Sequence, residues 1–145
     1  MDEALKQAEK ALKKQEVPIG AVIVKDGKII STGYNCRERK QNAIKHAEII
    51  AIEKACKKMK SWRLEDCEIY VTLEPCPMCA GAILNARIKK AYFGAKEKTS
   101  DDNILQSIVN STRLNHNCEI IQLEEYEKPC SQILTKFFKE KRQKN

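Results

Sequence analysis

Two short motifs bring together residue types that bind metals and move protons. The first is His46–Glu48 (His-Ala-Glu), and the second is Pro75–Cys79 (Pro-Cys-Pro-Met-Cys). One histidine and two cysteines are good zinc ligands, and a fourth position left to water is typical of a catalytic rather than a structural site. A glutamate close to such a site can carry the protons of that water. We therefore expect His46, Cys76 and Cys79 to bind zinc and Glu48 to act as the proton shuttle.

The local sequence also suggests how these side chains converge. Cys76 and Cys79 are three residues apart and would share one face of a helix, and the flanking prolines suit a helix start. His46 is expected to begin a helix that ends near Lys60. Inside a helix, His46 and Glu48 would point in different directions, so the ion must lie beyond the helix end. The prediction is two helix N-termini that point at one zinc ion.

Other interpretations of the same residues explain less of the pattern. The Cys-x-x-Cys pair could be a redox dithiol, but a dithiol does not explain the His-x-Glu motif. A closed structural zinc site would need a fourth ligand and would leave Glu48 without a task. His116 has no cysteine or acidic neighbour and is left out of the metal group. Glu74 is expected to be a structural partner for backbone or arginine.

The pattern of hydrophobic residues predicts an α/β fold. It indicates a mixed five-stranded sheet between helices on both faces, a three-layer α/β/α architecture. Asp26-Gly27 suits a tight hairpin turn between the first two strands. The expected helices are 2–16, 46–60, 75–87, 104–109 and 132–142, the expected strands are 19–24, 29–32, 67–73, 90–94 and 118–123, and 33–45 is expected to be irregular.

Bulk properties limit the class of protein. A length of 145 residues, with 42% hydrophobic and 32% charged residues, suits one domain over 1–145, with 141–145 as a frayed basic tail. The net charge of +7 suits either a nucleic-acid partner or simple solubility. The start of the chain does not resemble a signal peptide, and no apolar run could cross a membrane, so a cytoplasmic location is expected.

The cysteines outside the motif are predicted to be structural. Seven cysteines, an odd number, without a secretory signal favour reduced thiols over a disulfide framework. The five scattered ones are expected to be small core residues. They are Cys36, Cys56, Cys67, Cys118 and Cys130.

Beyond these residues, the sequence resembles a known family over nearly its whole length. The combination His-x-Glu and Pro-Cys-x-x-Cys is the signature of zinc-dependent nucleobase deaminases, the cytidine-deaminase-like superfamily. Further stretches are similar to the bacterial tRNA-specific adenosine deaminases. These stretches are Glu16–Val22, Tyr70–Ala82, Phe93–Ala95, Asn115-His116 and Phe137-Phe138.

The resemblance implies hydrolysis of adenosine to inosine at the wobble position of a tRNA anticodon stem-loop, with one Zn²⁺ per subunit. It implies that Asn35 hydrogen-bonds the target base, that Val17 and Leu73 form the apolar walls of its pocket, and that Ala47 offers its backbone N–H. It also implies an RNA-binding homodimer. Independently of the family, Asn35 could be a turn residue, and Val17 and Leu73 could be plain core.

The sequence departs from this family in one loop and at the residue before His46. Residues 96–103 contain no glycine, Glu97 stands where the family has aspartate, and Lys45 precedes His46 where a small residue is common. The zinc chemistry is unaffected by these changes, but substrate choice depends on the loop. Two alternatives therefore stay open: a deaminase of free guanine, cytosine or a nucleotide on the same fold, and a non-catalytic RNA-binding protein with a structural zinc.

Overall fold

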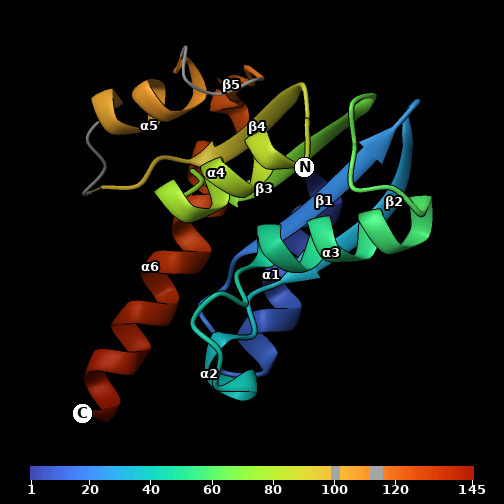
Figure 1. Ribbon diagram of the computed structural model, residues 1–145. Coiled ribbons are helices and arrows are strands. Elements are labelled where there is room, and N and C mark those ends of the chain that lie inside the picture. The colour runs from blue at the N-terminus through green and yellow to red at the C-terminus, as the bar shows by residue number, and fades with distance from the viewer. Residues whose placement is uncertain (99–101, 112–115) are drawn as a thin grey trace.

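The protein is a three-layer α/β/α sandwich around one mixed sheet. The computed structural model describes residues 1–98, 102–111 and 116–145. In Figure 1, α3 and α4 cross in front of the sheet, α1 lies behind it, and α6 runs away from it to the C-terminus. The helices are α1 (Asp2–Lys13), α2 (Arg37–Lys40), α3 (Ala47–Met59), α4 (Pro77–Asn85), α5 (Asp102–Val109), the 3₁₀ turn η1 (Glu124–Tyr126) and α6 (Glu127–Lys144). The predicted fold class is confirmed.

The sheet has the strand order β2-β1-β3-β4-β5. Its strands are β1 (Gly20–Lys25), β2 (Lys28–Tyr34), β3 (Cys67–Leu73), β4 (Lys90–Ala95) and β5 (Glu119–Gln122). β1 is antiparallel to β2 and β3, whereas β3, β4 and β5 are parallel. Asp26 and Gly27 have φ angles of 50° and 75°, which matches the tight hairpin turn expected at this dipeptide.

Two glycines allow helices to lie directly on the hairpin. A Cβ on Gly20 would come within 2.0 Å of the Ala4 carbonyl oxygen in α1. A Cβ on Gly33 would come within 2.4 Å of the Ala47 oxygen in α3, on the other face of the sheet. Any larger residue at Gly33 would therefore push away the helix that carries His46 and Glu48.

The main hydrophobic core lies between the sheet and helices α3, α4 and α5. Alternate residues of β3 face it, among them the fully buried Ile69 and Val71. Of the five scattered cysteines, four are buried and Cys56 is partly buried, and all are free thiols. The expectation that these cysteines fill the interior is therefore confirmed for four of them.

The N-terminal helix is shorter than the sequence pattern predicts. α1 ends at Lys13 instead of residue 16, because Gln15 adopts a left-handed φ of 61° and the Glu16 N–H bonds back to the Ala11 oxygen. The segment expected to be irregular, 33–45, contains the end of β2 and the one-turn helix α2. Its polar residues gave no periodic signal from which such a short helix could be predicted.

The C-terminal helix is longer than expected at both ends. α6 starts at Glu127 because Pro129 falls in its first turn, where backbone N–H groups have no helical partner. It continues to Lys144, two residues beyond the expected end, so most of the basic tail 141–145 is helical in this structure. α5 likewise starts two residues earlier than predicted. Among the described residues, no helix combines the length and apolar character needed to cross a bilayer.

Candidate metal centre and pocket

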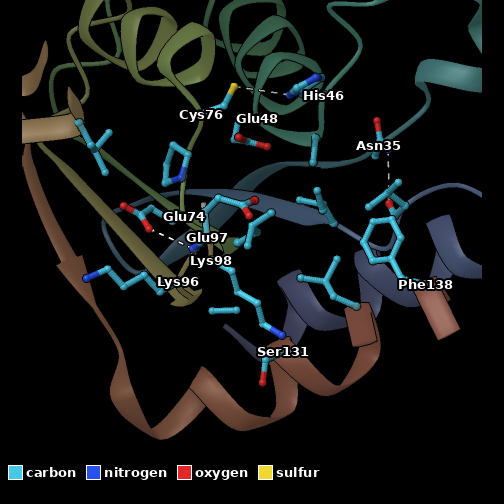
Figure 2. A pocket seen from close by; sticks show the side chains of 18 of the residues that line it. Asn35, His46, Glu48, Glu74, Cys76, Lys96, Glu97, Lys98, Ser131 and Phe138 are labelled. Atoms are coloured by element: carbon cyan, nitrogen blue, oxygen red, sulfur yellow. Dashed lines mark hydrogen bonds between the residues drawn. The ribbon is translucent and has the colours of Figure 1, made fainter. Parts of the chain in front are cut away.

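Two helix starts meet at the carboxyl end of the central strands. His46 is the N-cap residue of α3, and Cys76 is the N-cap residue of α4, with Pro77 at the first helical position. Both N-cap residues have extended backbones, with ψ angles of 157° and 168°, and neither uses its side chain as a cap. Their side chains therefore point off the helix ends, and Figure 2 shows them turned toward each other.

The three expected metal-binding side chains form one compact group. The Nδ1 of His46 lies 3.7 Å from the Sγ of Cys76 and 3.6 Å from the Sγ of Cys79. The three possible ligand atoms all lie within 4.8 Å of one another. The structure thus has the predicted convergence of two helix N-termini, and the group can hold a metal ion.

The thiols of this group have strongly different proton affinities. The pKa of Cys76 is lowered to about 4 because the Cys79 thiol donates a hydrogen bond to it, with His46 adding to the effect. The pKa of Cys79 is raised, because it is the donor of that bond and is buried. The hydrogen bond with Cys76 also raises the pKa of His46. One thiolate is thus present at neutral pH, and a thiolate is the form that binds a metal.

Glu48 lies in the first turn of α3, beneath the metal group (Figure 2). Its side chain is only 4% exposed. Burial raises the pKa of the Glu48 carboxyl, and a hydrogen bond with the Cys79 thiol partly offsets this effect. A carboxyl with a raised pKa exchanges protons near neutral pH more readily than an ordinary surface glutamate.

A cavity of about 740 Å³ opens beside this group. His46, Glu48 and Cys76 line one side of it. The other walls come from the segment before β1, the ends of β3 and β4, and helices α5 and α6. In Figure 2, Ser131 and Phe138 from α6 lie opposite the metal group.

The residues expected to contact substrate all line this cavity. Val17 and Leu73 are half-buried pocket residues rather than plain core. Asn35 is 6% exposed, and its Oδ1 accepts the Arg37 N–H at 3.3 Å while its Nδ2 donates to the Val17 oxygen at 3.4 Å. Asn35 is therefore both a turn residue and a pocket residue. Ala47 also lines the cavity, at the start of α3.

Sequence reasoning missed several residues at the mouth of the cavity. Phe138 is 43% exposed and lines the cavity, while the neighbouring Phe137 is buried. Two consecutive residues can both lie on the apolar stripe of a helix, so the sequence pattern alone does not show which of the two rings faces the core. The cations Arg37, Lys98 and Arg142 also line the cavity and had no sequence signal beyond their charge.

The loop that departs from the family pattern is attached to the site by two carboxylates. The Glu97 N–H donates to the Glu74 carboxylate at 3.1 Å, and the Lys96 N–H donates to Glu127 at 3.3 Å. The expected structural role of Glu74 toward backbone is thus present. His116 bonds the Ile88 oxygen through its Nε2 at 2.8 Å, away from the metal group. Asn115 and residues 99–101 of the loop lie outside the described residues.

A mixed five-stranded sheet with a His–Cys–Cys group and a buried glutamate beside one cavity defines a hydrolytic deaminase. A family model described as MafB19-like deaminase matches residues 1–142. A tRNA-specific adenosine deaminase of Bacillus subtilis is 47% identical over 147 residues, covering 99% of this chain and 89% of the relative. The chain therefore belongs to the family of tRNA-specific adenosine deaminases.

Solved structures agree with this membership. A structure from a study of A-to-I editing by tRNA:A34 deaminases matches with a TM-score of 0.84 and 36% identity, covering 92% of this chain and 97% of the other. A guanine deaminase from Bacillus subtilis is 42% identical, but the match covers 66% of this chain and 61% of the other, with a TM-score of 0.63. The similarity to the tRNA enzyme thus extends over more of both chains.

Proposed function

We propose that this chain hydrolyses adenosine to inosine at the wobble position of a tRNA anticodon, using one zinc ion held by His46, Cys76 and Cys79. The observation that carries the proposal is the His–Cys–Cys group beside the buried Glu48 at a cavity large enough for a nucleotide. Membership of the tRNA-specific family supports the choice of substrate.

The donor atoms fit zinc. Zinc–sulfur bonds of about 2.3 Å and zinc–nitrogen bonds of about 2.0 Å at tetrahedral angles place sulfur and nitrogen about 3.5 Å apart. The two sulfur–nitrogen distances in the structure are 3.7 and 3.6 Å. A zinc ion held by these three donors would keep a fourth position for water, which a closed structural site would not have.

The reaction adds water to the adenine ring and releases ammonia. Zinc bound here supplies a water whose pKa is lowered toward about 7. Glu48 would accept a proton from this water and deliver it to the ring nitrogen next to the carbon under attack. It would then take the remaining proton from the hydroxyl group added to that carbon and pass it to the departing amine, so that a carbonyl forms and ammonia leaves. Burial suits Glu48 to these transfers, because it raises the pKa of the carboxyl and so favours the form that carries a proton. Adenosine and water thus give inosine and ammonia.

The pocket residues hold the base. In this proposal Val17 and Leu73 contact the two faces of the adenine, and Ala47 donates its backbone N–H. The Asn35 amide uses one donor and one acceptor within the protein. An amide has two N–H donors and two acceptor lone pairs, so one donor and one lone pair stay available for the base.

The mouth of the cavity favours RNA over a free base. Arg37, Lys98 and Arg142 line it, and all three are exposed cations. Phe138 is an exposed aromatic ring on the same cavity, suited to stack on an unpaired base. A base in an anticodon loop is accessible without disrupting a duplex. The net charge of +7 adds long-range attraction for RNA.

The proposal includes a homodimer that works in the cytoplasm. Ile44 and Met78 are 50% and 37% exposed, and each is close in sequence to a residue of the metal group. Exposed apolar side chains of this kind suit a subunit interface. Sedimentation of the purified protein should give twice the monomer mass of 16.6 kDa.

One assay tests the substrate. The purified zinc-loaded protein is incubated with an arginine-tRNA anticodon stem-loop that carries wobble adenosine, and in parallel with guanine, cytosine and cytidine. Inosine in the RNA, with ammonia release that weakens as salt increases, supports the proposal. Lys98→Ala should reduce the slope of log affinity against log salt by about one. Turnover of a free base alone, unaffected by salt, would assign the site to the alternative class.

A further inference from the structure

A buried carboxylate outside the metal group holds the segment that leads to the pocket. Glu16 has 0% exposure and directly precedes Val17. Its two oxygens accept the backbone N–H groups of Glu38 at 3.2 Å and Arg39 at 2.6 Å. Among the described residues, no lysine or arginine forms an ion pair with it. A buried carboxylate needs such donors, so these two bonds strongly favour one placement of residues 38 and 39.

The segment held by Glu16 has little support of its own. α2 contains four residues, too few for a helix that is stable without tertiary contacts. Its remaining attachment is at its ends, where the Asn35 N–H bonds the Ile19 oxygen at 3.1 Å and the Cys36 N–H bonds the Lys45 oxygen at 3.0 Å. The middle of the segment therefore depends on the Glu16 carboxylate.

These bonds form a closed ring of contacts that includes the Asn35 amide. Glu16 fixes residues 38 and 39, the neighbouring Arg37 donates its N–H to the Asn35 Oδ1, and the Asn35 Nδ2 donates to the oxygen of Val17, next to Glu16. The two bonds of Asn35 are 3.3 and 3.4 Å long, near the limit for a hydrogen bond. A small displacement of residues 37–39 would break one of them and free the amide to rotate.

We propose that Glu16 is a positioning residue, which acts through residues 37–39 to orient the Asn35 amide toward the bound base. This inference rests on the proposed function, because it assumes that Asn35 contacts the base. It assigns a task to a residue that neither touches the cavity nor belongs to the metal group. A misplacement of about 1 Å in a substrate-orienting group can cost up to about a hundredfold in rate.

The variant Glu16→Gln tests this role with little change in volume. Glutamine keeps one acceptor oxygen but turns an N–H₂ group toward the second backbone N–H, so one of the two bonds is lost. The control is Glu9→Gln, on the exposed face of α1, which removes the same charge. We expect kcat/KM of Glu16→Gln for the anticodon stem-loop to fall about tenfold at unchanged zinc content, and that of Glu9→Gln to stay within about twofold.

A double-mutant cycle separates positioning from general destabilisation. If Glu16 acts through Asn35, then adding Glu16→Gln to Asn35→Ala should change kcat/KM by less than about twofold, because coupled residues are not additive. Full additivity of the two substitutions would overturn the proposal. So would a Glu16→Gln variant whose kcat and KM both equal those of the wild type.

Amide hydrogen exchange provides a readout that does not depend on the reaction. In Glu16→Gln, the amides of Arg37, Glu38 and Arg39 should exchange faster, while those of α1 and α3 stay protected. Unchanged protection of residues 37–39 would overturn the proposal even if the enzyme acted on another substrate. A third outcome separates the two proposals. If the wild type is inactive on the stem-loop but Glu16→Gln still exchanges faster at residues 37–39, the proposed function is refuted and the contact between Glu16 and its segment is kept.

Discussion

The Sγ of Cys79 and the Nδ1 of His46 lie 3.6 Å apart, although 33 residues separate them in the sequence. The contact forms because α3 and α4 both begin at the same end of the sheet. The carboxyl ends of parallel strands are where α/β proteins commonly place their ligand sites. The metal group is thus made by the ends of two helices, and its stability depends on how those ends are held.

Removal of one sulfur from this group should remove the metal. In Cys79→Ser, we expect the zinc content to fall well below one ion per chain and ammonia release to be lost, because a hydroxyl is a much poorer zinc ligand than a thiolate. Cys56→Ser is the matched control, since this partly buried thiol lies outside the group. Metal analysis of the purified variants and ammonia release measure the effect; full zinc content in Cys79→Ser would contradict the assignment.

Glu48 should be needed for turnover but not for metal binding. Replacement by alanine removes the proton carrier, and we expect turnover to fall by about 10² to 10⁴. The zinc content and the far-UV circular dichroism of Glu48→Ala should match those of the wild type. Single-turnover formation of inosine is the measurement.

The control for this prediction lies on the same helix. Glu53 in α3 is exposed and pairs with Lys45 at 2.8 Å, an interaction of at most about 1 kcal/mol. Glu53→Ala should therefore keep nearly full activity. Unchanged ammonia release from Glu48→Ala, or a loss of zinc together with the activity, would show that Glu48 has another role.

The metal group and the order of the main elements could be predicted from the sequence because both depend on local patterns. Proline next to Cys76 marks a helix start, and β3 follows the predicted range without change. The roles of the ligands and of Glu48 stay predictions, although the structure brings their side chains together.

The remaining features depend on contacts between distant segments. The one-turn helix α2 forms where Glu16 accepts its N–H groups, a contact across 22 residues that no local pattern encodes. Likewise Phe138 lines the cavity while its neighbour Phe137 is buried. The position of the helix axis decides which of the two is buried, and this position depends on the packing of Cys130 against Gly94.

Gly33 should be essential for the placement of α3. Alanine there would bring a Cβ within 2.4 Å of the Ala47 oxygen and 2.8 Å of the Ala51 nitrogen. We expect Gly33→Ala to lower the free energy of unfolding by about 1–3 kcal/mol, as for other overpacked sites. Zinc affinity should fall as well, because α3 carries His46 at its start. Urea denaturation and competition with a zinc chelator measure the two effects.

The matched control is a substitution at a glycine whose surroundings have room for a Cβ atom. A Cβ on Gly81, inside α4, would meet no atom within 4 Å. Gly81→Ala should therefore stabilise the protein by about 0.5–1 kcal/mol through helix propensity. If Gly33→Ala were as stable as the wild type, α3 would not lie as close to β2 as the structure shows.

Two buried thiols should make the protein less stable at alkaline pH. Burial raises the pKa of Cys118 to about 11 and that of Cys130 to about 11, from 9.0. Between about pH 9 and about pH 11, the unfolded chain has lost thiol protons that the native chain keeps. The native state then binds more protons, so the free energy of unfolding falls as pH rises from about 9 to about 11. Below about pH 9 both states hold these protons, and the two thiols add no pH dependence.

Comparison with a variant that lacks these two thiols isolates their effect from the titration of lysines. In Cys118→Ala/Cys130→Ala the lysines are the same as in the wild type. As pH rises above 9, the free energy of unfolding of the wild type should therefore fall more than that of the variant. The variant starts less stable at pH 7, because each substitution leaves a small cavity in a packed interior. Urea denaturation at intervals of half a pH unit follows the difference. A constant difference from pH 7 to pH 11 would mean that the buried thiols ionise as readily in the folded chain as in the unfolded one.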